Sequence, residues 1–226
     1  MSKPIVLFSG GLDSTVLLWS LRPNVKAISF DYNQRHYKEL DTAQRICNQY
    51  DIEHVVVDLA MSEPGYVSLA ELFHQAQSSQ TNRDVQVPEG HYAEESMKAT
   101  VVPNRNMIMI SIAVGWAVSS GSKDVYAAMH AGDHTIYPDC RSEFVVPLQQ
   151  AIQKGNAWNI CYFWAPFLEK TKAEIVKLGA SIHAPLDQTW SCYKGGILHC
   201  GVCGTCVERK EAFQLAGVVD PTEYEK

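Results

Sequence analysis

Residues 5–14 read IVLFSGGLDS, and this stretch decides the fold. Its first four residues form a short apolar run that predicts a buried strand, and residues 14–21 predict a helix. Between them, Gly10 and Gly11 allow positive φ and let the backbone approach a ligand closely, while the start of the helix presents unpaired N–H groups to an anion. The stretch therefore predicts a strand-to-helix turn that binds phosphate.

Polar side chains of the same turn suit a nucleotide. The hydroxyls of Ser9, Ser14 and Thr15 can donate to phosphate oxygens, and Asp13 can reach a Mg²⁺ ion that bridges them. The pattern is neither a Walker A loop nor a dinucleotide-binding Gly-x-Gly-x-x-Gly motif. An ordinary turn capped by Asp13 or Ser14 is the alternative, but two glycines and three polar residues exceed what a cap requires. The predicted nucleotide-binding residues are Phe8, Ser9, Gly10, Gly11, Leu12, Asp13, Ser14, Thr15, Val16, Leu17 and Leu18.

Strand and helix patterns alternate along the chain beyond this turn. Apolar runs rich in β-branched or aromatic residues predict strands at 25–30, 53–57 and 124–129. Helices are predicted at 14–21, 36–50, 104–120, 141–154, 172–178 and 208–216. This order predicts an α/β fold with a parallel, Rossmann-like sheet in a domain spanning residues 1–182. Residues 61–100 break the alternation with scattered prolines and glycines, which predicts an insertion that could act as a lid.

Composition limits the classes of function. The chain has 226 residues, 46% of them hydrophobic, which is enough for one core and a small appendage. A formal net charge of −6 offers no basic excess, so the expected partners are small molecules and not nucleic acid. The N-terminus lacks the pattern of a signal peptide, and the longest apolar run, residues 107–118, is too short to cross a membrane. We therefore expect a cytoplasmic protein without a membrane partner.

The C-terminal cysteines indicate a metal site. Four of the seven cysteines gather near the end of the sequence, at Cys192, Cys200, Cys203 and Cys206. Their spacing favours one structural Zn²⁺ held by four thiolates, with intervening glycines at the tight turns. A close Cys-x-x-Cys-x-x-Cys run can also hold an iron–sulfur cluster, and His199 could replace one cysteine. Residues 183–226 are predicted to be a small zinc-binding module with a closing helix.

Several motifs carry a resemblance to known enzymes. The pattern Ser-Gly-Gly-x-Asp-Ser at residues 9–14 resembles the loop of the PP-loop ATP pyrophosphatases, which adenylate a substrate and release pyrophosphate. Further motifs are DYNQRH at 31–36, VPNRN at 102–106, GDH at 132–134 and YPDCR at 137–141. Together with the cysteines they resemble the 7-cyano-7-deazaguanine synthase family over nearly the whole chain. Asn33 and Asn104 stand where that family frequently has glycine, and both lie in turns in which asparagine tolerates a left-handed backbone.

The resemblance implies a reaction and its residues. Enzymes of this family convert 7-carboxy-7-deazaguanine and ammonia to the nitrile, and ATP with Mg²⁺ activates first the carboxylate and then the amide. The resemblance also implies a homodimer and a lysine, here Lys172, that is directed toward the nucleotide phosphates. The expected catalytic residues are Asp13, Ser14, Lys172 and Arg105. The expected substrate-binding residues are Gln34, Arg35, His36, Arg105, Asn106, Asp133, Asp139 and Arg141.

Each of these side chains has a structural alternative. The arginines at 105 and 141 can form bidentate contacts with phosphate or carboxylate, whereas a lone arginine is usually a surface charge. The aspartates at 133 and 139 could accept hydrogen bonds from a guanine-like edge or cap a turn. His36, His130 and His134 are candidate proton carriers near neutral pH, although a lone histidine is more often structural. Lys172 could also be a solvated lysine at a helix start.

Two other kinds of function stay open at the level of sequence. One is another PP-loop enzyme, either an amide-forming relative or a tRNA thiolase with an iron–sulfur cluster. The other is a non-enzymatic zinc-ribbon binding module on a degenerate nucleotide fold. Brown colour on purification, or tRNA retained at moderate salt, would favour the thiolase, and the binding module predicts that replacing Asp13 leaves function untouched.

Overall fold

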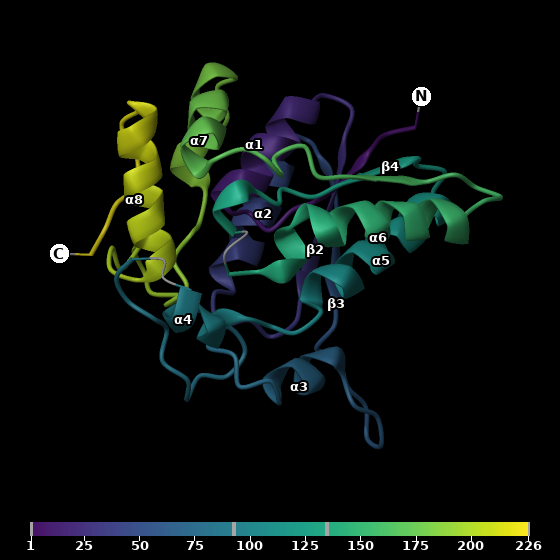
Figure 1. Ribbon diagram of the computed structural model, residues 1–226, viewed down its shortest axis with the longest axis horizontal. Coiled ribbons are helices and arrows are strands. Elements are labelled where there is room, and N and C mark those ends of the chain that lie inside the picture. The colour runs from purple at the N-terminus through teal and green to yellow at the C-terminus, as the bar shows by residue number, and fades with distance from the viewer. Residues whose placement is uncertain (1, 92–93, 134–135, 226) are drawn as a thin grey trace.

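Five parallel strands form one sheet at the centre of the structure, a computed structural model that describes residues 2–91, 94–133 and 136–225 (Figure 1). The strands are β1 Ile5–Leu7, β2 Lys26–Asp31, β3 Glu53–Asp58, β4 Asp124–Tyr126 and β5 Tyr162–Trp164. Their order is β3-β2-β1-β4-β5, and each neighbouring pair is parallel. The strand order reverses between β1 and β4, and open α/β sheets bind ligands at such a point, outside the carboxyl ends of the strands. The predicted α/β fold with a parallel sheet is confirmed.

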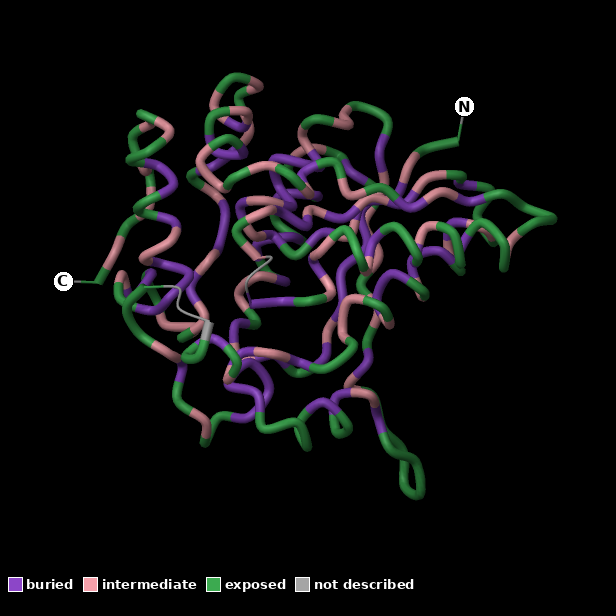
Figure 2. Tube along the Cα trace, viewed as in Figure 1, coloured by how far each residue is buried: buried purple, intermediate pink, exposed green. Residues whose placement is uncertain are grey.

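Helices cover both faces of this sheet. The longer helices are α1 Leu12–Leu21, α2 Lys38–Gln49, α5 Arg105–Ser119, α6 Ser142–Gly155, α7 Lys172–Ser181 and α8 Gly204–Ala216. Helices α5 and α6 pack on one face and α1 and α2 on the other, while α7 packs against α1 and α8 lies beside α7 (Figure 1). The colouring of Figure 2 shows the buried residues concentrated where the helices meet the sheet. The result is a three-layer arrangement with the strand ends open to one side.

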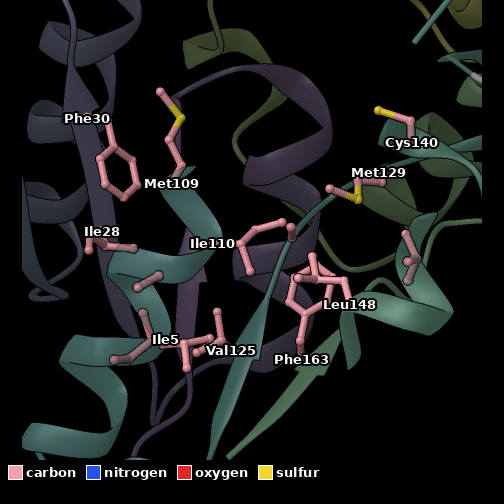
Figure 3. Close-up of a cluster of buried hydrophobic side chains, with 14 of the residues drawn as sticks. Ile5, Ile28, Phe30, Met109, Ile110, Val125, Met129, Cys140, Leu148 and Phe163 are labelled. Carbon is pink, nitrogen blue, oxygen red and sulfur yellow. The ribbon is translucent and has the colours of Figure 1, made fainter. Parts of the chain in front are cut away.

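The two faces of the sheet carry separate sets of buried apolar side chains. Ile5 of β1 belongs to the set under α5 and α6, and Val6 belongs to the set on the opposite face. Successive residues of a strand point to opposite faces, so a strand buried on both sides reads as one continuous apolar run. Figure 3 shows part of the first set, where Ile110 of α5 lies among Val125 of β4 and Phe163 of β5.

Most element boundaries lie within three residues of the sequence-based prediction, and three differences are informative. Strand β4 ends at Tyr126, three residues before the predicted end at Met129, and the chain after it is irregular as it enters the site described below. Strand β5 was not predicted, because it has only 3 residues and lies at the sheet edge, where Trp164 is 42% exposed. Helix α8 begins at Gly204 and not at the predicted residue 208, because Cys203 is its N-cap.

Residues 61–100 interrupt the alternation between β3 and α5, as predicted. The insertion contains α3 Leu69–His74, α4 Glu94–Met97 and the 3₁₀ turn Lys98–Thr100. The backbone N–H of Arg35 donates to Gln80 O at 2.8 Å, and an antiparallel bridge joins Glu89 to Cys203. The insertion is thus attached both to the segment after β2 and to the C-terminal cysteines.

Other features of the chain bear on the sequence-based predictions. Asn33 and Asn104 each adopt a left-handed backbone with a φ of 59°, so both asparagines do occupy turns of the kind in which glycine is usual. Phe213 of α8 packs in the same apolar cluster as Ile175 of α7, and the domain boundary near residue 182 stays a prediction. Among the described helices, none combines the length and the apolar character that a membrane span requires.

Candidate functional site

A cavity of about 270 Å³ opens at the carboxyl ends of the strands. Its walls come from the glycine loop after β1, the segments after β2 and β4, the first turns of α5 and α7, the insertion and the C-terminal segment. The polar side chains that line it include Ser9, Asp13, Ser14, Ser29, Gln34, His36, Glu39, Gln80, Arg105, Asn106, Asp133, Lys172, Ser191 and Thr205. The cavity is therefore at the position where open α/β sheets bind ligands.

The glycine loop forms one wall. Gly10 has a φ of 82°, and a Cβ atom on it would lie 2.4 Å from Glu39 O, so only glycine fits. Gly11, in contrast, is the N-cap of α1 with a φ of −73°, so the predicted need for positive φ holds for Gly10 alone. Trp190 N donates to Gly10 O at 3.1 Å, and this hydrogen bond attaches the C-terminal segment to the loop.

Hydroxyl groups hold the loop in shape. Gly11 N donates to Ser9 Oγ at 3.1 Å, and the Ser9 and Ser14 hydroxyls lie 3.1 Å apart. Ser14 Oγ and Thr15 Oγ1 both donate to Gly11 O, at 3.2 and 2.8 Å. The exposed backbone N–H groups at the start of α1 remain oriented toward the cavity end of the helix, where an anion is stabilised.

A group of charged side chains lies beside the loop. Lys172 Nζ is 3.4 Å from Asp13 Oδ2 and 2.7 Å from Glu208 Oε2. His130 Nε2 lies 3.6 Å from the same Asp13 oxygen and 3.4 Å from Asp133 Oδ2. A capping box of Thr171 and Glu174 starts α7 and so fixes the position of Lys172 at its first residue. The group combines three carboxylates and one lysine at a single end of the cavity.

The pKa values of this group are set by burial and by the neighbouring charges. Burial alone would raise the pKa of Asp13, but the nearby Lys172 and His130 outweigh it and hold that pKa below its usual value. Burial opposes the charge of Lys172, but Asp13 and Glu208 outweigh it and raise the lysine pKa. Burial raises the pKa of Asp133. Asp13 Oδ1 is buried and has no hydrogen-bond partner among the described residues, so the ionised carboxylate has one oxygen that these residues leave unsatisfied.

Arginine, amide and aromatic side chains form a further part of the cavity wall. Arg105 Nη1 donates to Tyr32 Oη at 3.1 Å and to Gln80 Oε1 at 2.7 Å. Gln34 is held by the backbone, because its Nε2 donates to Phe30 O and its Oε1 accepts from Tyr32 N. Asn106 and the aromatic rings of Tyr137 and Tyr193 also line this side. The wall combines planar apolar surfaces with a few fixed polar groups.

The structure gathers most of the predicted site residues in this cavity. Those that line it are Phe8, Ser9, Gly11, Leu12, Asp13, Ser14, Gln34, His36, Arg105, Asn106, Asp133 and Lys172. Those that do not line it are Gly10, Thr15, Val16, Leu17, Leu18, Arg35, Asp139 and Arg141. Thr15 and the three apolar residues that follow it are buried in α1 behind the loop. His134 lies outside the described residues.

Arg35 has a definite structural partner outside the cavity. Its Nη2 donates to Asn82 O and to Val85 O, both at 2.9 Å. These two carbonyls belong to the insertion, so Arg35 attaches the insertion to the segment after β2. Asp139 and Arg141 belong to the short 3₁₀ turn Pro138–Cys140 and its C-cap before α6.

Sequence reasoning missed several residues of the cavity wall. Glu39, Gln80 and Tyr193 line it, and Glu208 contacts Lys172 from α8. Glu39 follows the motif DYNQRH at 31–36 and lies near the start of a predicted helix, but this position alone gives little indication that it belongs to the site. Gln80 and Glu208 come from the insertion and the closing helix, and only the tertiary fold brings them to the site.

The four C-terminal cysteines form a second site. The sulfur atoms of Cys192, Cys200, Cys203 and Cys206 all lie within 4.8 Å of one another, and all four residues are buried and free of disulfides. Cys200 N and Cys203 N donate to Cys192 Sγ and Cys200 Sγ at 3.4 and 3.3 Å. His199 Nε2 accepts from Ser191 N at 3.1 Å, so its ring serves that backbone contact. This cluster of four cysteines could hold a metal ion.

Comparisons with known proteins cover almost the whole chain. The family model described as "Queuosine biosynthesis protein QueC" matches residues 3–217. A curated "7-cyano-7-deazaguanine synthase" of Sinorhizobium fredii is 48% identical over 229 residues, covering 99% of this chain and 92% of the relative. One of the same name from Methanoregula boonei is 46% identical and covers 99% of both chains. Among solved structures, NMN synthetase from Francisella tularensis is 14% identical with a TM-score of 0.49, covering 96% of this chain and 78% of that one.

Proposed function

The chain belongs to the queuosine biosynthesis protein QueC family, and on that premise we propose that it is an ATP-dependent ligase that makes 7-cyano-7-deazaguanine. Its substrates are 7-carboxy-7-deazaguanine, ammonia and ATP. ATP first adenylates the carboxylate, ammonia converts the adenylate to an amide, and a second ATP activates that amide for loss of its oxygen. Each activation releases pyrophosphate and then AMP.

The observation that carries the proposal is the position of Asp13 and Lys172 beside the glycine loop, in a cavity that aromatic and amide side chains also line. A carboxylate oxygen is a poor leaving group, and transfer to AMP makes it a good one. Lys172 supports that transfer by neutralising charge that develops on the phosphates, and the N–H groups at the start of α1 bind the departing pyrophosphate. The protein's main contribution is to hold the reacting groups in position.

The Mg²⁺ that accompanies ATP fits the residues of this loop. Its neighbours lower the pKa of Asp13 and so keep it ionised, and its Oδ1 has no partner within residues 2–91, 94–133 and 136–225, which suits an oxygen ligand of a hard cation. When bound, the ion supplies charge neutralisation at the phosphate oxygens. We assign Asp13 as its protein ligand, with the hydroxyls of Ser9 and Ser14 nearby on the same loop.

We assign the deazaguanine to the part of the cavity that is lined by arginine, amide and aromatic side chains. A planar heterocycle suits the rings of Tyr32 and Tyr193, and fixed polar groups among them give orientation. Arg105 is held between Tyr32 and Gln80, so its guanidinium is oriented before any ligand binds. Asn106 and Asp133 complete the assignment, as hydrogen-bonding groups from the start of α5 and from the segment after β4.

The cysteine cluster is assigned to one structural Zn²⁺. A tetrahedral ion with Zn–S bonds of about 2.3 Å places its sulfurs about 3.8 Å apart. Cys200 Sγ and Cys206 Sγ are 3.9 Å apart, and all four sulfurs lie within 4.8 Å. In an iron–sulfur cluster each thiolate bonds a different iron and the sulfurs spread further, so the spacing favours zinc over the thiolase alternative.

The remaining partners follow from charge and chemistry. A net charge of −6 does not suit a nucleic-acid substrate, so we propose that the enzyme acts on the free base. From the family resemblance we also propose that it forms a homodimer. Seven free cysteines suit a reducing cytoplasm. Sedimentation of the purified chain, alone and with tRNA, checks both expectations.

The proposal is tested by the reaction itself. Purified protein is incubated with carboxydeazaguanine, ammonium and Mg-ATP, and mass spectrometry follows the nitrile, AMP and pyrophosphate. We expect two AMP for each nitrile, and we expect Asp13→Ala to abolish the formation of AMP and of the nitrile. Absence of AMP with the unmodified protein would reject the assignment, and a variant Asp13→Ala of full activity would favour a non-enzymatic role.

A further inference from the structure

Two polar side chains of the cavity wall, His36 and Glu39, have no role in the adenylation chemistry above. His36 is 3% exposed and the Glu39 side chain is 16% exposed. Their contact is direct, with His36 Nε2 3.4 Å from Glu39 Oε2. Both line the cavity, and Glu39 Oε1 lies 3.8 Å from the position that a Cβ atom of Gly11 would take. The pair therefore lies directly beside the glycine loop.

One nitrogen of His36 faces Glu39, and the other, Nδ1, is buried and has no hydrogen-bond partner among the residues that the structure describes. The ring packs on Tyr193 with centroids 5.2 Å apart. A buried polar atom without a partner is rare in a folded protein, and in a cavity wall it indicates a ligand that supplies the missing hydrogen bond. A histidine with one nitrogen against a carboxylate and the other available is the arrangement of a general base.

The reaction contains a substrate that the preceding assignments leave without a site. Ammonia must be held next to the adenylated carbonyl, and its nitrogen must lose protons on the way to a nitrile. A lone pair on an imidazole, supported by a carboxylate, provides both a hydrogen-bond acceptor for N–H and a place for the proton.

We propose that His36 and Glu39 form the site for the nitrogen co-substrate, and that His36 Nδ1 takes the proton which the nitrogen loses as the carbon–nitrogen bond forms. This inference rests on the proposed function. In the amide-forming step the nitrogen lone pair attacks the adenylated carbon, the bond from that carbon to the AMP oxygen breaks, and AMP leaves with the electron pair. One N–H proton passes to His36, and Glu39 stabilises the imidazolium.

The same pair serves the second half of the reaction. When ATP adenylates the amide oxygen, the nitrogen gives up one proton and the amide becomes an adenylated imidate. Loss of AMP then breaks the carbon–oxygen bond, and the last N–H proton leaves as the nitrile forms. Because the same nitrogen loses each proton, one base held beside it serves all three losses, with His36 returning each proton to the departing phosphate product or to water before the next is taken.

Burial and the neighbouring charges set the protonation state of the pair. Burial lowers the pKa of His36 to about 3, and the charges of Arg105 and Arg35 add to that effect, so the ring is neutral and its lone pair is available. Burial raises the pKa of Glu39 to about 8, with Arg105 and Lys172 opposing the rise and Asp13 adding to it. Ionisation of Glu39 leaves a carboxylate facing His36 Nε2, which is the form that supports proton transfer to Nδ1. At a fixed concentration of free NH₃, the rate of amide formation should therefore rise as the pH passes through about 8.

The test separates adenylation from the attack by ammonia. Pyrophosphate–ATP exchange that depends on carboxydeazaguanine reports the adenylate alone and needs no ammonia. Glu39→Gln is expected to keep exchange within about twofold and to lower nitrile formation by about 100-fold. Hydroxylamine attacks as a neutral and stronger nucleophile, so hydroxamate formation in this variant should recover to within about tenfold of the unmodified protein. Asp41→Asn, an exposed carboxylate on the same helix, is the matched control and should leave all three rates unchanged.

The outcomes are distinguishable. Equal loss of exchange and nitrile formation in Glu39→Gln, or equal loss with ammonia and hydroxylamine, would overturn the role of the pair. His36→Gln read by the same assays makes the result independent of one variant, and its pH profile should lose the rise near pH 8. If the unmodified protein shows no pyrophosphate–ATP exchange, the proposed function itself is rejected, and the ammonia site that rests on it is rejected with it.

Discussion

Lys172 Nζ lies 3.4 Å from Asp13 Oδ2, so the first residue of α7 faces the second residue of α1 across the glycine loop. Replacement by methionine keeps the length of the side chain and removes the charge. We expect Lys172→Met to lower pyrophosphate–ATP exchange by about 10²–10³-fold, because a charge directed at the developing phosphate charge is lost. Lys177→Met, on the exposed side of the same helix, should leave exchange unchanged. Equal effects of the two variants would contradict the assignment.

Alanine substitution at Gly10 and at Gly121 separates the cost of a steric clash from the cost of backbone strain. Gly10 and Gly121 have φ values of 82° and 74°, so alanine at either position carries a strain of about 1–2 kcal/mol. Only at Gly10 does the new Cβ meet other atoms, with Glu39 O at 2.4 Å, which adds about 1–3 kcal/mol. Denaturant unfolding should therefore show a larger loss for Gly10→Ala than for Gly121→Ala. Similar losses would mean that α2 yields to the added methyl group.

The cysteine cluster predicts metal content and stability together. The unmodified protein should contain one zinc per chain by elemental analysis, and no visible absorption from iron and sulfur. Cys203→Ser should lose the zinc and lower the melting temperature by more than about 10 °C, since each kcal/mol shifts the midpoint of a chain of this size by about 2–4 °C. Cys161→Ala removes a buried cysteine outside the cluster and should retain the metal.

Buried histidines predict how stability depends on pH. Burial lowers the pKa of His54 and of His199 to about 4 in each case, below the value of about 6.5 for an unfolded chain. The unfolded chain therefore binds protons first, so stability is complete above pH 6.5 and falls as the pH drops from 6.5 toward 4. Free energies of unfolding measured across this range should show the decline. His54→Gln should flatten it, and His74→Gln, at an exposed position, should not.

The features that sequence reasoning predicted are those that local rules determine. The glycine loop, the α/β alternation and the left-handed turns at Asn33 and Asn104 each depend on a few consecutive residues. The cysteine cluster is also nearly local, because three of its members lie within seven residues. For the same reason Lys172 could be placed at a helix start, where Thr171 and Glu174 form a capping box.

The features it did not predict depend on contacts between distant segments. Glu208 reaches Lys172 only because α8 lies beside α7, and Gln80 reaches Arg105 only because the insertion folds back over the strand ends. Arg35 belongs to a motif of the predicted site, yet its guanidinium binds two carbonyls of the insertion, a contact that no local pattern encodes. Strand β5 is short and half exposed, so its sequence carries almost no periodic signal.

The hydrogen bond from Trp190 N to Gly10 O has a consequence for the protein's synthesis. The phosphate-binding turn leaves the ribosome well before the residue that completes it. A nascent or prematurely terminated chain that stops before Trp190 holds the glycine motif without this contact. We expect such fragments to leave cellular ATP untouched, so that nucleotide consumption begins only after Trp190 has been added.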